Sequence, residues 1–121
     1  MERGMRMLTI EALNAYGADT QAGLRRCLGD ESFYLGLVEM LVCDEKFELL
    51  AAAVRQRELS ACLCLAYALM DTAAGLGLTP LTEQLEKLIL CLRLAGDGAV
   101  LDKQHGLLAR TLLPLQAIQE A

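Results

Sequence analysis

Apolar residues recur every three or four positions along most of this chain, which is the spacing of one face of an α-helix. Glycines and residues that cap helices divide the pattern into segments joined by short turns. We expect a first short helix from about residue 9 to 16, ending at Gly17, and a second from about residue 19 to 28, ending at Gly29. The aspartates expected to cap the N-termini of helices are Asp19, Asp30 and Asp44.

The apolar run near the middle of the chain predicts a central helix from about residue 59 to 76. Gly77 can adopt the left-handed conformation that ends such a helix. Thr79 is then expected to be the N-cap of the next helix, with Pro80 at its first helical position. The turn after the central helix is therefore the boundary that the sequence defines best.

The last two expected helices differ in how much of their surface is apolar. The first of them places leucines on one stripe, at Leu81, Leu85, Leu88 and Leu92. Between residues 88 and 94 the only charged residue is Arg93, so more than one face there is apolar and some other surface must cover it. A turn at residues 96–98 precedes the last helix, which Pro114 is expected to kink or end.

Length and composition favour one all-α domain. A chain of 121 residues can bury one sizeable core, so we assign residues 8–121 to a single helical bundle domain that follows a disordered segment at residues 1–7. The chain holds 27 Leu and 17 Ala against 4 Val and 3 Ile. Unbranched side chains lose little conformational freedom in a helix, and this balance therefore favours helix over strand.

Charge and cysteine content exclude several classes of partner. The net charge of -5 argues against nucleic acid, because phosphate binding needs clustered Lys and Arg. The apolar run at residues 61–70 is shorter than the roughly 20 residues of a membrane span, and residues 1–7 carry no signal-peptide pattern, so we expect a cytoplasmic protein with no membrane partner. The five cysteines include no C-x-x-C pair and are expected to be reduced residues that fill the core, without a metal.

The central helix has a core-facing side and an accessible side at 100° per residue. The expected core-facing residues are Cys62, Leu65, Ala66, Leu69, Ala73 and Leu76. The accessible side carries Ser60, Cys64, Tyr67, Asp71, Ala74 and Gly75, flanked by Leu63 and Met70. An aromatic ring and a carboxylate among small residues make this side a flat patch that a partner can approach.

Residues 66–77 read A-Y-A-L-M-D-T-A-A-G-L-G and resemble the signature A-H-x-L-K-G-x-A-x-x-L-G of the histidine-containing phosphotransfer (HPt) domain. Residues 15–19 and 28–34 also resemble the N-terminal part of bacterial HPt domains, so the resemblance covers most of the chain. It implies an antiparallel four-helix bundle with short additional N-terminal helices. It also implies docking to the receiver domain of a response regulator, or to a histidine kinase, with no cofactor.

The residues that carry HPt chemistry are replaced. Tyr67 stands at the position of the phospho-accepting histidine, Met70 at that of a lysine and Asp71 at that of a glycine. A histidine offers an unprotonated ring nitrogen near neutral pH. A phenol has no ring nitrogen, and with an ordinary pKa of about 10 it stays almost wholly protonated there. We therefore expect a degenerate HPt domain that acts as an adaptor or competitor in a phosphorelay, without enzymatic activity. The residues expected to contact the partner are Cys64, Tyr67, Met70, Asp71, Ala74 and Gly75.

Other interpretations stay open. Tyr67 can be an ordinary surface residue rather than a docking anchor. The chain can be a structural helical protein that self-associates, for example as a homodimer, through residues 88–94 or the Tyr67 face. His105, the only histidine, can be proposed as a substitute phospho-acceptor, but it lacks the surrounding signature and we expect a plain surface histidine. No Walker loop, dinucleotide fingerprint or nucleophile elbow is present, so no residues support an enzyme.

Overall fold

The computed structural model describes residues 8–94 and 97–120, and every regular element within these two ranges is an α-helix. In chain order these helices are α1 (Ile10–Tyr16), α2 (Thr20–Arg26), α3 (Glu31–Val42), α4 (Lys46–Arg55), α5 (Leu59–Gly75), α6 (Thr79–Arg93) and α7 (Gly98–Glu120). The all-α prediction is thereby confirmed. The predicted disorder of residues 1–7 lies outside the described residues, as does part of the predicted turn at 96–98.

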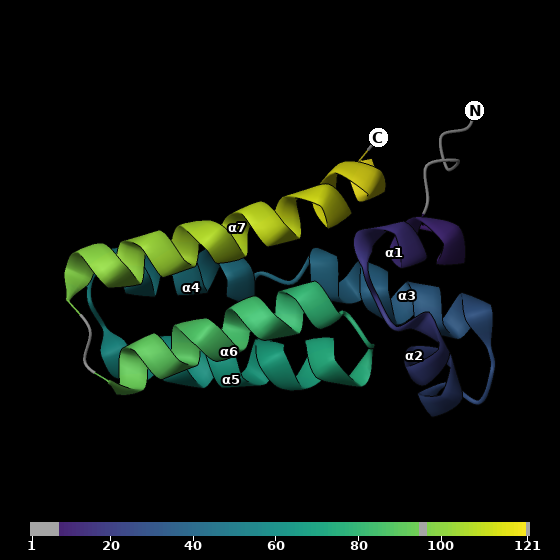
Figure 1. The fold of residues 1–121 in the computed structure, drawn as a ribbon, viewed down its shortest axis with the longest axis horizontal. Helices are drawn as coiled ribbons and strands as arrows, with labels where there is room; N and C mark the ends of the chain where they lie inside the picture. Colours follow the sequence, from purple (N-terminus) through teal and green to yellow (C-terminus); the bar gives the residue numbers. More distant parts are fainter. Residues whose placement is uncertain (1–7, 95–96, 121) are drawn as a thin grey trace.

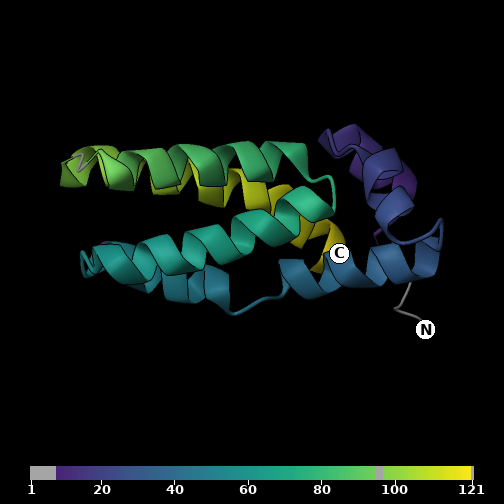
Figure 2. The same cartoon turned by 90° about the horizontal axis from the view of Figure 1, so that it is seen from below.

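Four helices form a bundle along the long axis of the molecule (Figure 1). These helices are α4, α5, α6 and α7, and they follow one another through short turns (Figures 1 and 2). Each packs against the next with the chain direction reversed, and α4 also contacts α7. Helix α3 extends beyond α4 at the end where α5 finishes, and α1 and α2 cover that end (Figure 2). Within the described residues, no helix has both the length and the apolar content needed to cross a membrane.

Most of the predicted helix boundaries are confirmed by the caps. The carboxylates of Asp19 and Asp30 accept hydrogen bonds from the backbone N–H groups of Ala22 and Phe33, and Gly17 ends α1 with a left-handed backbone. Helix α2 ends at Arg26, two residues earlier than predicted. Its chain reverses through two consecutive left-handed residues, Leu28 and Gly29, rather than through the glycine alone.

Two predictions for the C-terminal half need correction. Thr79 is not an N-cap, because α6 begins one residue earlier than expected and Leu78 holds the capping position. The Thr79 hydroxyl instead donates to the carbonyl oxygen of Gly77 at 3.4 Å. Of the two predicted effects of Pro114, the end of the helix does not occur: α7 continues to Glu120, and Leu112 and Leu115 on the two sides of the proline are buried in the core.

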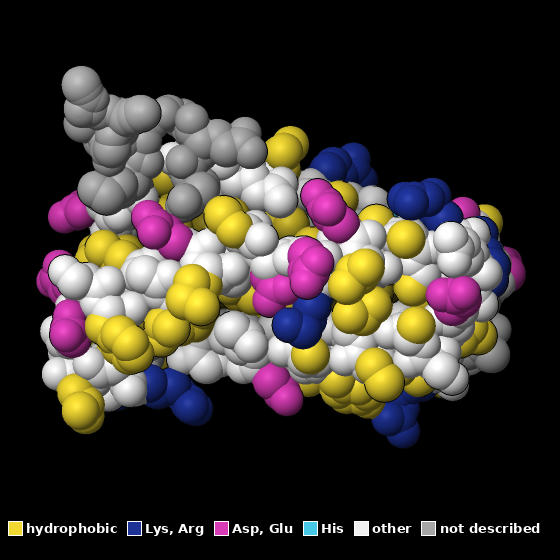
Figure 3. Space-filling view, turned by 180° about the vertical axis from the view of Figure 1, so that it is seen from behind, with side chains coloured by type: hydrophobic (Ala, Val, Ile, Leu, Met, Phe, Trp, Pro, Cys, Tyr) yellow, Lys and Arg dark blue, Asp and Glu magenta, His cyan; other side chains and the backbone are white. Residues whose placement is uncertain are grey.

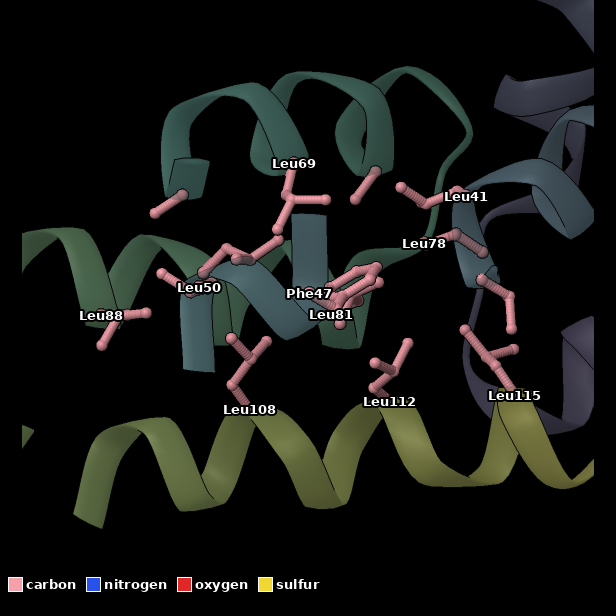
Figure 4. Close-up of a cluster of buried hydrophobic side chains, with 14 of the residues drawn as sticks. Leu41, Phe47, Leu50, Leu69, Leu78, Leu81, Leu88, Leu108, Leu112 and Leu115 are labelled. Atoms are coloured by element: carbon pink, nitrogen blue, oxygen red, sulfur yellow. The ribbon is translucent and has the colours of Figure 1, made fainter. Parts of the chain in front are cut away.

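The core runs through the bundle and into the N-terminal helices as one continuous cluster. Figure 4 shows Leu69 of α5 pointing toward Leu50 and Phe47 of α4, with Leu108 and Leu112 of α7 approaching from the opposite side. The predicted core side of the central helix is confirmed except for Leu65, which is half-buried. The expectation that cysteines fill the core is wrong for Cys43 and Cys64, which are exposed.

The turn between α5 and α6 connects the N-terminal helices to the bundle. The backbone N–H of Asp19 donates to the carbonyl oxygen of Gly77 at 2.7 Å, and the hydroxyl of fully buried Tyr34 donates to the carbonyl oxygen of Leu76, also at 2.7 Å. Gly77 has a φ of 73°, and a Cβ atom at this position would collide with the Asp19 carbonyl oxygen. Only glycine fits here without moving one chain segment away from the other.

We predict that Gly77→Ala lowers the free energy of unfolding by at least about 2 kcal/mol, because it combines a left-handed alanine with a collision against backbone. Urea denaturation measures the change. Gly36→Ala is the matched control, because a Cβ atom at this α3 position meets nothing, and the variant should be more stable by about 0.5–1 kcal/mol. Equal behaviour of the two variants would contradict the assigned role of the turn.

We predict that alkaline pH weakens the fold through Tyr34. Burial raises the pKa of Tyr34 to about 12, and Cys27 and Asp19 act in the same direction. The folded protein retains the phenol proton at a pH where the unfolded chain, with a pKa near 10, releases it, so stability falls as the pH rises from about 10 to about 12. Denaturation at a series of pH values should show a shallower decline for Tyr34→Phe, and an unchanged slope would refute this account.

Candidate functional site

The accessible side of α5 is formed as the sequence predicts, and we call its six predicted contact residues the α5 face. They are Cys64, Tyr67, Met70, Asp71, Ala74 and Gly75. Cys64, Asp71 and Ala74 are exposed, and Tyr67 is 37% exposed. Met70 and Gly75 are half-buried, because they lie at the two borders of the face, where neighbouring helices begin to cover α5.

The α5 face is divided into two rows that lean toward different helices. Tyr67 leans toward α6, and Ala74 lines a shallow hollow with residues of α6 such as Thr82 and Glu86. Asp71 and Gly75 lean the other way and line a groove shared with α3. One helix therefore contributes to two neighbouring surfaces, which the sequence pattern presented as a single flat patch.

The Tyr67 phenol is held by Arg93 of α6, whose Nη1 donates to the Tyr67 oxygen at 2.7 Å. This hydrogen bond orients the ring across the α5–α6 boundary. A guanidinium stays protonated at all ordinary pH values, so Arg93 cannot act as a base that removes the phenol proton. Sequence reasoning missed this contact, because the register between two helices cannot be derived from residues 26 positions apart.

A groove with a volume of about 450 Å³ lies between α2, α3 and α5. Its walls are mainly apolar, and the side chains of Phe33 and Met40, 56% and 70% exposed, stand along α3. Three charged residues also line it, namely Arg26, Asp44 and Asp71. Hydrophobic side chains are exposed over the end of the molecule that carries α2 and α3, with charged groups around them (Figure 3). The sequence analysis did not predict this groove.

His105 is half-buried in α7 rather than a plain surface residue, which corrects the expectation. Burial lowers its pKa, and Arg55 lowers it further, against the opposite effect of Asp102. Neither of these charged neighbours belongs to the α5 face. Asp102 itself pairs with Arg57, whose Nη1 lies 2.9 Å from the Asp102 Oδ1.

No metal centre is formed among residues 8–94 and 97–120, where no group of three or more His, Cys, Asp or Glu side chains is placed to hold an ion. Asp44 accepts the backbone N–H of Lys46 and pairs with the Lys46 ammonium group, although the N-cap of α4 is Glu45 and not Asp44 as predicted. Comparison of the chain with protein-family models, with curated proteins and with solved structures found no match. The function must therefore be argued from the geometry of the α5 face and the groove.

We predict that the Tyr67–Arg93 contact contributes little to stability, because hydrogen bonds between exposed side chains compete with water. A double-mutant cycle of Tyr67→Phe and Arg93→Ala, followed by urea denaturation, should give a coupling free energy below about 1 kcal/mol. A coupling above about 2 kcal/mol would show that the pair is a structural element and that Tyr67 is not free to meet a partner.

Proposed function

We propose that this chain is a degenerate HPt-type domain that binds receiver domains of two-component systems through the α5 face without carrying phosphate. In this proposal α4 to α7 are the four-helix HPt bundle, α1 and α2 are the additional N-terminal helices, and the protein works in the cytoplasm. The observation that carries the proposal is the position of Tyr67. It is accessible at the centre of α5, at the register where the resemblance places the phospho-accepting histidine.

The chemistry around Tyr67 supports binding rather than phosphoryl transfer. The phenol has no nitrogen lone pair, and its oxygen accepts a hydrogen bond from a guanidinium that cannot act as a base. Met70, at the position of the lysine, is half-buried and uncharged. Asp71 places a carboxylate one helical turn from Tyr67, where it would repel a phosphoryl group. A partner could still dock, because none of these changes alters the shape of the helix.

Titration of the full chain against the receiver domains encoded in the same genome tests the proposal. We expect at least one receiver to bind, and we expect Tyr67→Glu to weaken that binding at least tenfold, because it places an anion at the centre of the interface. Leu113→Glu is the matched control, because Leu113 is an exposed apolar residue of α7 outside the α5 face. Failure of every receiver to bind would refute the proposal.

Restoring the missing chemistry provides a second prediction. The triple variant Tyr67→His, Met70→Lys and Asp71→Gly should acquire acid-labile phosphate from a phosphorylated receiver that binds the wild type, whereas the wild-type chain should not. The same triple variant with His105→Gln identifies the modified residue. Phosphate that disappears with His105 would assign transfer to α7 and contradict the proposed role of the α5 face.

A second candidate function is self-association without signalling, and the exposure of two leucines at the C-terminal end of α6 favours it. Leu90 and Leu94 are 57% and 71% exposed, so the surface expected to be covered is open in the single chain. If a second copy covers it, light scattering should show a dimer that Leu90→Glu converts to a monomer. A monomer at high concentration would exclude this function.

A further inference from the structure

The groove between α2, α3 and α5 has the shape and lining of a surface that receives another chain. Its apolar walls include Leu37 and Met40 of α3 and the small residue Gly75 of α5, which leaves room for a side chain to enter. Met40 and Phe33 remain largely exposed, although burial of large apolar side chains stabilises a folded chain. Within the described residues no other element covers them.

The charges along the groove are separated by sign. Asp44 follows the end of α3 by two residues, and Arg26 precedes its start by five, so these two charges belong to opposite ends of α3. Helix α5 runs toward the end of the molecule where α3 begins (Figure 2), so Asp71 lies one turn closer to the end of α3 than Gly75 does. Asp71 and Asp44 therefore stand toward one end of the groove, and Arg26, at the end of α2, stands at the other. The groove has an acidic end and a basic end.

The surrounding surface determines what kind of chain can lie in the groove. Every regular element in residues 8–94 and 97–120 is helical, so these ranges present no open strand edge with which an extended peptide could pair. A ligand pressed against apolar side chains must then satisfy its own backbone hydrogen bonds, which a helix does. From Phe33 to Leu41 the groove follows α3 for about 12 Å, the length of roughly two helical turns.

We propose that this groove binds one amphipathic helix of a partner protein. The apolar stripe of that helix faces Phe33, Leu37 and Met40. A basic residue of the helix meets Asp71 and Asp44, and an acidic residue about two turns away meets Arg26. This inference goes beyond the proposed function, because it needs neither a receiver domain nor any role for Tyr67.

A displayed library of helical peptides, about 16 residues long, tests the inference on the full chain. Every peptide carries leucines on one stripe, and the positions that flank the two ends of the stripe vary among Glu, Lys and Gln. We expect selection to enrich peptides with a basic residue at one end and an acidic residue at the other. An enriched pool without opposite charges, or no enrichment, would overturn the proposal.

Variants of the protein then locate the binding. A synthetic peptide from the enriched pool should bind Met40→Glu at least tenfold more weakly than it binds the wild type. Leu113→Glu, which changes an exposed leucine of α7, should bind the peptide like the wild type. Asp71→Lys should shift the preference toward peptides that are acidic at that end. Peptide binding that Met40→Glu leaves unchanged would place the peptide elsewhere and refute the assignment of the groove.

Two further measurements separate this inference from the other functions. Tyr67→Glu should leave peptide binding unchanged, so loss of receiver binding and loss of peptide binding can occur independently. Light scattering of the wild type and of Met40→Glu tests whether a second copy of the chain occupies the groove. A wild-type dimer that Met40→Glu converts to a monomer would show that the groove is a self-association surface and would overturn the proposal of a partner helix.

Discussion

The arrangement of this protein depends on two backbone carbonyl groups in the turn between α5 and α6. The carbonyl oxygens of Leu76 and Gly77 accept hydrogen bonds from Tyr34 of α3 and from the backbone of Asp19, at the start of α2. Both acceptors become available because Gly77 adopts a left-handed backbone that turns the chain away from the axis of α5. The N-terminal helices are thereby attached to the bundle at the point where the central helix ends.

The same attachment creates the surface on which our proposals rest. Because α3 is anchored beside the end of α5, Asp71 and Gly75 face α3 across a groove rather than open solvent. On the other side of α5, Arg93 reaches over from α6 and holds Tyr67. The accessible side of α5 is thus the border between two surfaces, one polar and one mainly apolar. A partner large enough to cover the α5 face would also reach the groove.

The residues around Tyr67 agree with the proposed role in binding. A phenol held by a guanidinium, a half-buried methionine and a carboxylate do not favour phosphoryl transfer, because no nucleophilic nitrogen is present among them and the carboxylate would repel a phosphoryl group. They do form a rigid surface, since all three side chains stand on one helix whose opposite side is fully packed. The exposed apolar residues of α3 add contact area that the core does not use.

The sequence alone determined the helical class, most helix boundaries and the accessible side of α5, because these features depend on local spacing, caps and the 3.6-residue period. It placed the start of α6 one residue late, at Thr79, and it left open whether Pro114 kinks or ends α7, which in the structure continues past it. Only the tertiary structure decided that Arg93 meets Tyr67 and that Arg26, Met40 and Asp71 share one groove. Such contacts join residues that are distant in the chain, and they depend on how the helices are placed relative to one another. Side-chain packing between helices sets this placement, and the local sequence pattern does not.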